Sequence, residues 1–348
     1  MDVLNATGRR RETYHIELKY SLLWECALGI AAITNTSLLS TLDKPVSYWE
    51  DLRGNFGQEI NEQLNFVETH NTWKAILQLL HNKEITSLSE FTQYIDDLKE
   101  EDLRYYCLPY LGIEFQEKRK RAASGDKEAI HRLMDRIKDH NFFPRYIDFI
   151  CSVDMNLLKS HLISVMVGWY QFVIQPNSEN MNLVLQRDID SKTKMSHSLQ
   201  PEEFVEWATG GIQYLPEPSV HTVLLIPQHI YRPWNIEADI EGTKVFYYPI
   251  SNESLDPTDP YMPNHLLILR YKALGDEVRL RIVKLLYEKS RTLQELTENI
   301  QIGKSTIHHH LKILRSAKLV EIESSKYTLK RTPIDSLPVE LTHFLTKG

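Results

Sequence analysis

The chain has 348 residues, of which 42% are hydrophobic and 25% charged, a mixture typical of a soluble globular protein with two or three domains. Its formal charge of −7 hides an asymmetry: residues 261–348 hold 15 Lys and Arg against 9 Asp and Glu, a net of +6, so residues 1–260 carry −13. The three cysteines, Cys26, Cys107 and Cys151, form no CxxC pair and give no support to a disulfide framework or a cysteine zinc site.

The N-terminal residues predict a strand followed by a buried helix. Apolar and polar side chains alternate over residues 13–20, and from Ser21 the apolar spacing becomes helical in SLLWECALGIAAITN. No apolar signal segment precedes them, and the longest apolar stretches, at 22–39 and 162–174, are interrupted by polar residues or too short to cross a bilayer. We therefore expect a cytoplasmic protein that makes no use of a membrane.

Helical patterns dominate the chain as far as residue 174, and strand patterns follow. Helices are expected at 46–69, 72–81, 88–99, 101–111, 124–140 and 144–174. The basic run EKRKR at 117–121 is typical of a solvated helix face or loop. The segments MNLVLQRDI, HTVLLIPQHIYRPW and TKVFYYPI are rich in β-branched and aromatic residues and predict strands, with EADIEG (237–242) as a hairpin turn between the last two. A proline-rich stretch at 251–264 marks the main domain boundary.

The last 84 residues have clear helix signals. A first helix breaks at Gly275, and the next begins at Asp276, whose carboxylate can accept amide hydrogens of the first turn. Residues 292–295 (TLQE) fit a capping box. A tight connection at 301–303 precedes another helix, and VEIESSKYTLK (320–330) alternates as a β-hairpin does. Helix, short helix, turn, helix and hairpin is the order of a winged helix-turn-helix.

The motifs ALGDEVRLRIVKLL and TLQELTENIQIGKSTIHHHLKILRSAKLVEIE resemble the ArsR/SmtB family of winged helix-turn-helix transcriptional regulators. The resemblance covers residues 269–331, and the preceding part resembles, more loosely, the long N-terminal extensions of some bacterial ArsR-like regulators. The expected fold is mostly α. It comprises a mainly helical N-terminal domain (1–180), a β-rich subdomain (181–260), an α+β winged helix-turn-helix DNA-binding domain (265–331) and a C-terminal tail or short helix (332–348).

Three consecutive histidines, His308, His309 and His310, suggest a metal site, but helix geometry opposes it. At 100° per residue they spread over about 200° of arc, whereas ligands on one helix face need a spacing of three or four residues. His310 falls beside the apolar face that contains Ile307 and Leu311. We therefore expect His310 to be a partly buried structural histidine.

The resemblance implies which side chains face DNA. It places Lys304, Ser305, His308 and His309 at the usual DNA-facing positions, with Thr306 and Lys312 as contacts to the DNA backbone. Lys326 in the wing, with Lys330 and Arg331 after it, is also expected to meet phosphates. His308 stands where the family commonly has a small hydroxyl residue, so the family's sequence preference is not carried over. The short wing turn does not favour insertion into the minor groove.

The sequence offers no metal or catalytic motif. Family members that sense soft metals carry cysteines in the helix before the recognition helix, whereas LQELTE has none. In the tail, Glu340 and His343 are three residues apart, but one such pair does not make a metal site. HExxH, GxSxG, P-loop and GxGxxG motifs are absent from the sequence. We expect no enzyme, no metal and no cofactor.

These patterns predict a sequence-specific transcriptional regulator that binds double-stranded operator DNA as a homodimer. The N-terminal region is expected to serve dimerisation, or to sense an unknown small-molecule effector or a partner. Two alternatives remain open. The N-terminal region can be a small-molecule receptor or enzyme-like domain with an accessory winged helix, or the chain can be an interaction scaffold whose winged helix does not touch DNA.

Overall fold

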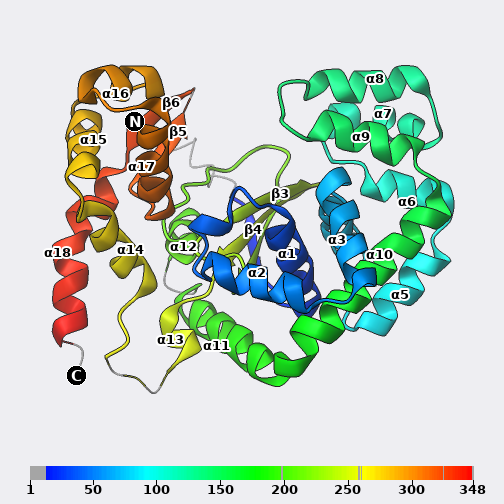
Figure 1. Ribbon diagram of the computed structural model, residues 1–348, viewed down its shortest axis with the longest axis horizontal. Coiled ribbons are helices and arrows are strands. Elements are labelled where there is room, and N and C mark those ends of the chain that lie inside the picture. Colours follow the sequence, from blue (N-terminus) through cyan, green and yellow to red (C-terminus); the bar gives the residue numbers. More distant parts are fainter. Residues whose placement is uncertain (1–12, 197–198, 258, 260, 324, 347–348) are drawn as a thin grey trace, which may run out of the picture.

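The computed structural model describes residues 13–196, 199–257, 259, 261–323 and 325–346. An N-terminal body, residues 13–257, contains a small sheet surrounded by helices, and a C-terminal module beginning at His265 lies against one side of it (Figure 1). The mostly α fold with a β-containing region and an α+β C-terminal module is confirmed.

A four-stranded sheet lies in the body. Its strands are β1 His15–Leu18, β2 Thr222–Gln228, β3 Ile236–Ile240 and β4 Thr243–Pro249. The order is β1-β2-β4-β3, with β1, β2 and β4 parallel and β3 antiparallel to β4. The strands predicted within 13–20, 221–234 and 243–250 are confirmed. The segment 237–242, predicted only as a turn, supplies most of β3 as well as the turn.

Helices cover both faces of this sheet. They are α1 Leu22–Thr34, η1 Leu39–Thr41, α2 Val46–Asn55, α3 Gln58–His70, α4 Trp73–Asn82, α5 Leu88–Asp97, α6 Glu100–Cys107, η2 Ile113–Phe115, α7 Gln116–Ala123, α8 Lys127–Arg136, α9 Phe143–Ser152, α10 Met155–Trp169, η3 Tyr170–Ile174, η4 Gln175–Asn177, α11 Ser178–Ser196, α12 Pro201–Thr209 and α13 Asn252–Leu255. One sheet face packs on α1 in the main core, and Phe204 and Val205 of α12 cover the other. Because β1 pairs with β2, residues from both ends of the body build one sheet.

The strand predicted at MNLVLQRDI (181–189) is wrong, because this segment lies in α11. Val184, Leu185, Asp188, Ile189 and Lys192 are buried, at the spacing of one helix face. Pro176 does not break the preceding helix, since it occupies the first turn of η4, where its missing N–H is tolerated. The boundary expected at 180/181 therefore falls inside continuous helix.

The helical run Met155–Ser196 is, among the described residues, the one helix long and apolar enough to cross a membrane by length and composition. It consists of α10, η3, η4 and α11 in succession. In this fold α10 packs on α3 and α5, and α11 packs on α12 and α13. These contacts are those of a helix integrated into the body.

Candidate nucleic-acid interface

The C-terminal module follows the predicted order of elements. These are α14 His265–Leu274, α15 Glu277–Glu288, α16 Leu293–Ile300, α17 Lys304–Ser316, β5 Val320–Glu323, β6 Lys326–Leu329 and α18 Arg331–Thr346. Asp276 caps α15 by accepting the amide hydrogen of Arg279 at 2.9 Å. The capping box at α16 is complete, because Thr292 and Glu295 each bond the other's backbone N–H. Both predicted helix starts are confirmed.

A tight turn connects α16 to α17. Gln301 adopts a left-handed conformation with φ of 60°, and α17 begins directly after Gly303. The buried residues of α17 are Ile307, Leu311 and Leu314, which pack into a hydrophobic core belonging to the module alone. The apolar face of α17 thus packs in the module core, and the opposite face is exposed to solvent.

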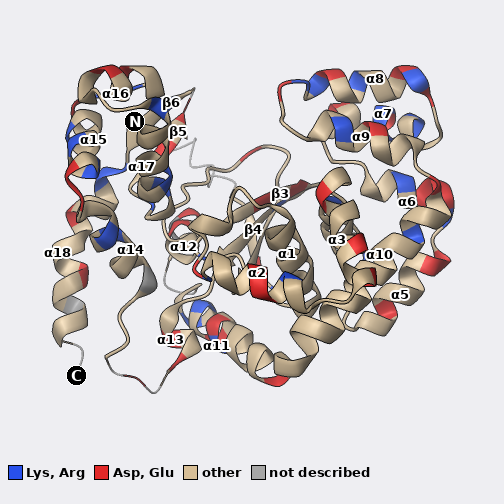
Figure 2. Cartoon of the chain, viewed as in Figure 1, with Lys and Arg blue, Asp and Glu red and all other residues tan. Residues whose placement is uncertain are grey.

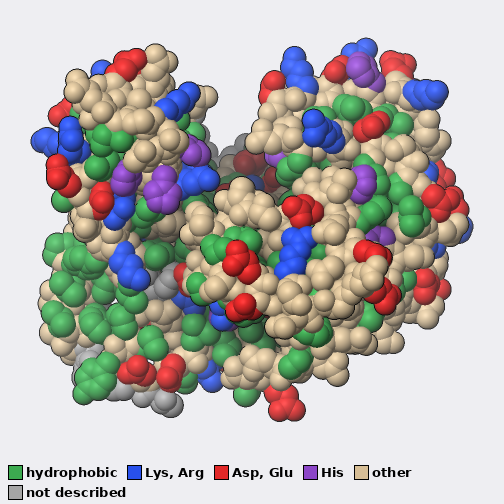
Figure 3. All heavy atoms as spheres, viewed as in Figure 1, with side chains coloured by type: hydrophobic (Ala, Val, Ile, Leu, Met, Phe, Trp, Pro, Cys, Tyr) green, Lys and Arg blue, Asp and Glu red, His purple; other side chains and the backbone are tan. Residues whose placement is uncertain are grey.

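The residues predicted to face DNA lie on that outer face and at the wing. Lys304, Ser305, Thr306, His308, His309 and Lys326 are exposed, and Lys312 is half-buried. Within the described part of the chain, none of these seven side chains makes a hydrogen bond or ion pair. Histidine, Lys and Arg side chains gather on the visible face of the module (Figure 3). The structure thus brings them together on one surface, while their contacts with DNA stay a prediction.

His310 points away from this surface. Its side chain is 13% exposed, and its Nδ1 lies 3.7 Å from Oδ1 of Asp276, the residue that caps α15. Burial lowers the pKa of His310, although the Asp276 carboxylate acts in the opposite direction. The partly buried histidine expected from helix geometry is confirmed. Among the described residues, no three His, Cys, Asp or Glu side chains are grouped as metal ligands.

The wing is a short hairpin that also contacts the start of α16. β5 and β6 pair antiparallel, and Arg291 exchanges two backbone hydrogen bonds with Tyr327 at 3.0 and 2.7 Å. Lys326 lies at the exposed turn end of β6. The C-terminal tail is a full helix, α18, whose Glu340 receives two hydrogen bonds from Nη1 of Arg270 at 2.7 and 2.8 Å. The Glu340 carboxylate thus ties α18 to α14.

Two lysines behind the recognition helix have a role that the sequence did not reveal. Nζ of Lys318 donates to the carbonyl oxygen of Thr209 at 3.2 Å, and Nζ of Lys330 donates to that of Gly211. Gly210 and Gly211 have φ of 70° and 121°, in the left-handed region that favours glycine. The lysines therefore hold the module against the end of α12. No local pattern signals this contact, since its partners are more than 100 residues apart.

Burial at this junction changes the amine of Lys318. It lowers the pKa of Lys318 to about 7, and the neighbouring Lys330 charge acts in the same direction. Lys330 itself is paired with Glu321, at 3.4 Å from Nζ to Oε2. The junction thus contains one compensated ammonium group and one amine that burial drives toward its neutral form.

Comparison with known proteins agrees with this geometry. Residues 276–321 match the model of the bacterial regulatory protein family arsR. The C-terminal module is an ArsR-type helix-turn-helix domain. The transcriptional repressor SdpR of Bacillus subtilis (strain 168) is 29% identical over 82 residues, which cover 22% of this chain and 91% of that protein. No solved structure matches the chain.

The ArsR-type module makes this chain a DNA-binding transcriptional regulator. In helix-turn-helix proteins the N-terminal residues of the second helix contact base edges, and cations and hydroxyls nearby contact phosphates. The exposed first turns of α17 have this position in the module. The match ends at residue 321 and leaves the body, with its sheet and its cavities, outside the family model.

Proposed function

We propose that the protein regulates transcription as a homodimer that binds duplex DNA in a sequence-specific manner. The observation that carries this proposal is the exposed first half of α17, where the side chains of Lys304, Ser305, His308 and His309 make no hydrogen bond or ion pair within the described part of the chain. The net charge of +6 over residues 261–348 adds attraction to phosphates. Lys and Arg occur along α15 and α17, while the body helices carry both Lys and Arg and Asp and Glu (Figure 2).

An apolar surface supports the homodimer. Tyr271 of α14 is 42% exposed, and Val339 and Leu345 of α18 are 70% and 71% exposed. Hydrophobic side chains cover the region of α14 and α18 in Figure 3. A continuous apolar patch of this kind marks an interaction surface, and a two-fold dimer places two recognition helices about one DNA turn apart.

The body is proposed to sense an effector or partner rather than to catalyse a reaction. It contacts the module through Lys318 and Lys330, so a change in the body can reach the DNA-binding elements. The sequence of the body contains none of the catalytic motifs considered above. A regulator of this kind acts where the chromosome lies, which is the cytoplasm of a bacterium.

The DNA-binding proposal is tested by measuring affinity against salt concentration. Fluorescence anisotropy with a duplex recovered by genomic footprinting should give an affinity that falls steeply with salt. Each lost phosphate contact lowers the salt slope by about one. The double substitution Lys304→Ala with Lys312→Ala should therefore lower the slope by up to about four per dimer. Lys284→Ala, at an exposed position of α15, is the matched control.

An affinity that does not depend on salt, or that the double substitution leaves unchanged, would contradict DNA binding by α17 and favour an interaction scaffold. The dimer is tested separately by sedimentation. Val339→Glu with Leu345→Glu should shift the protein to monomer, whereas Leu215→Glu, on an exposed residue of the body, should not. A monomeric wild-type protein at micromolar concentration would contradict the homodimer.

A further inference from the structure

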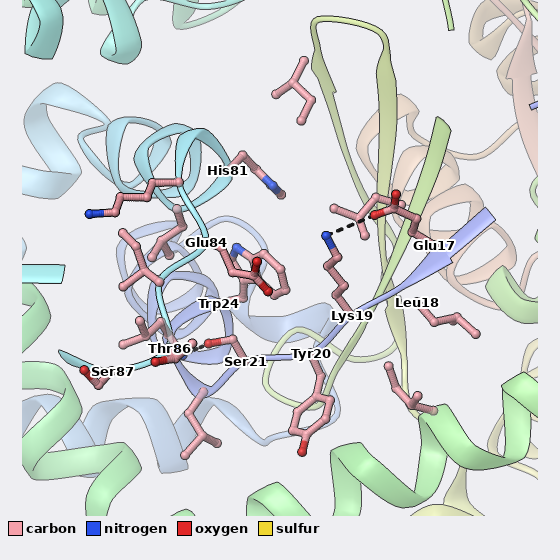
Figure 4. A pocket seen from close by; sticks show the side chains of 18 of the residues that line it. Glu17, Leu18, Lys19, Tyr20, Ser21, Trp24, His81, Glu84, Thr86 and Ser87 are labelled. Carbon is pink, nitrogen blue, oxygen red and sulfur yellow. Dashed lines mark hydrogen bonds and ion pairs between the residues drawn. The ribbon is translucent and has the colours of Figure 1, made fainter. Parts of the chain in front are cut away.

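A cavity in the body lies between the edge strand β1 and the connection from α4 to α5. Its volume is about 730 Å³, within the range of about 300–1,000 Å³ found for small-ligand sites. Figure 4 shows Glu17 and Lys19 entering from β1, His81 and Glu84 from the opposite wall, and Trp24 of α1 between them. The ArsR-type module contributes no residue to this lining.

Two Lys and two Glu line the cavity, and one of the carboxylates is without a partner among the described residues. Nζ of Lys19 lies 3.1 Å from Oε2 of Glu17, so these two charges compensate each other. Lys83 also lines the cavity, but its Nζ lies over the ring of Tyr94, a residue outside the lining, 5.3 Å from the ring centroid. Glu84 is exposed and has no hydrogen-bond or ion-pair partner within the described residues. With Lys19 paired to Glu17 and Lys83 held over Tyr94, the Glu84 carboxylate is the charged group of the lining that remains for a ligand.

Aromatic groups form the wall near this carboxylate. The rings of Trp24 and His81 lie 5.6 Å apart with an interplanar angle of 31°. Burial lowers the pKa of His81 to about 3, so its ring, which bonds the Tyr247 hydroxyl at 2.5 Å, adds no positive charge. Trp24 is only 9% exposed, and its indole N–H is without a partner in the described structure. Indole rings attract organic cations, so the accessible part of the Trp24 ring suits a cationic ligand.

We propose that this cavity binds an organic ammonium compound with an apolar body. The ammonium group pairs with Glu84, and the apolar body lies against Trp24 and the neighbouring Leu80 and Ile85. An anion of the same shape meets the unpaired Glu84 carboxylate and is rejected. Binding itself is independent of the proposed function, whereas the role of the ligand as effector rests on it.

Helix α11 connects the cavity to the DNA-binding module. Its residue Ile189 lines the cavity, while the adjacent Asp188 accepts hydrogen bonds from Ser251 N at 3.0 Å and Ser254 Oγ at 2.9 Å. These serines begin the segment that leads to α14. One turn further along α11, Lys192 lines a smaller cavity of about 110 Å³ together with Lys318 of the module. A ligand that shifts α11 therefore acts on both attachments of the module.

The proposal is tested by calorimetric titration of the full-length protein with probes of one shape and different charge. The cationic probe is 2-phenylethylamine, its neutral counterpart is 2-phenylethanol, and its anionic counterpart is phenylacetate. Choline tests whether a quaternary ammonium group is accepted as well as a primary one. Saturable binding is expected for the amine, with much weaker binding of the alcohol and none of the acid.

Variants of Glu84 identify the site. Because the carboxylate is exposed, Glu84→Gln should weaken amine binding about tenfold, the lower end for a charge-assisted contact, and Glu84→Lys should reverse the preference toward phenylacetate. Glu50→Gln, which removes an exposed carboxylate from α2, should leave binding unchanged. Equal affinity for amine and alcohol, absence of amine binding at millimolar concentration, or an unaltered affinity of Glu84→Gln would each overturn the site.

A second measurement separates the effector role from DNA binding itself. Without ligand, Glu84→Gln should bind the footprinted duplex as wild type does. The amine should change the DNA affinity of wild type and, at the same concentration, hardly that of Glu84→Gln. Amine binding that leaves DNA affinity unchanged would overturn the effector role and keep the site. A failure of DNA binding altogether would refute the proposed function, while the titration would still decide the site.

Discussion

Lys318 provides a direct test of how the module is held on the body. Replacing it by methionine keeps the length of the side chain and removes the amine that donates to Thr209 O. The wild-type amine has a pKa of about 7 in the folded protein because it is buried, against about 10.4 in an unfolded chain. The unfolded chain therefore binds more protons, and the free energy of unfolding increases with pH.

The magnitude follows from these two pKa values. Above about pH 10.4 the Lys318 amine is neutral in both the folded and the unfolded chain, and its burial does not lower the free energy of unfolding through protonation. As pH falls toward 7 the unfolded chain takes up a proton that the folded protein does not, and the free energy of unfolding decreases. Between pH 9 and pH 7 the wild type should lose at most about 2 kcal/mol by this route. Lys318→Met forfeits one hydrogen bond, about 1 kcal/mol, but has no amine to protonate. It should be the more stable protein at pH 7, with an advantage that shrinks as pH rises.

The assay is urea denaturation of wild type and variants at pH 7, 8 and 9. The free energy of unfolding should rise with pH equally in wild type and in the matched control Lys284→Met. Between pH 7 and pH 9 it should rise by about 2 kcal/mol less in Lys318→Met. If Lys318→Met followed the wild-type profile, the amine would not be buried as described, and the junction between module and body would be open in solution.

Three further predictions concern packing, pH and DNA preference. Gly29→Ala should lower the free energy of unfolding in urea by about 1–3 kcal/mol, because the added Cβ would lie 2.7 Å from Cζ2 of Trp169; a neutral result would show that the indole can move aside. Burial lowers the pKa of His161 to about 4, so wild type should lose about 2 kcal/mol as pH falls from 7 to 5. His161→Gln should lose correspondingly less in the same titration, and an identical loss would contradict a neutral imidazole between Thr72 and Gln63. His308→Ser should change the sequences selected from a random duplex pool while keeping the salt slope, since the residue is expected at base edges; an unchanged preference would place His308 outside the interface.

The module could be predicted because its signals are local. The cap at Asp276, the capping box at Thr292 and the apolar spacing of α17 each act within one or two helical turns, and all three are present in the structure. The half-buried position of His310 followed from the 100° step of the helix alone. These features depend little on residues distant in the chain.

The body was harder to predict because its decisive contacts are distant. β1 pairs with β2 about 200 residues later, and no residue near β1 signals this partner. In α11, apolar side chains at Val184, Leu185 and Ile189 suit a helix face, but their β-branched and aliphatic composition also suits a strand. Packing on α12 and α13 decides between the two. The cavity beside β1 depends on the same distant pairing and has no sequence motif.

The junction also defines the side from which DNA can approach. Lys318 and Lys330 follow the recognition helix, where free cations would meet phosphates, but both donate to body carbonyls. α17 contacts η1 of the body as well, and residues 1–260, with a net charge of −13, repel DNA. Lys304 at the start of α17, Lys312 in its second half and Lys326 at the wing turn remain for phosphates. We therefore expect DNA to meet α17 at its N-terminal turns, the end that helix-turn-helix proteins present to base edges.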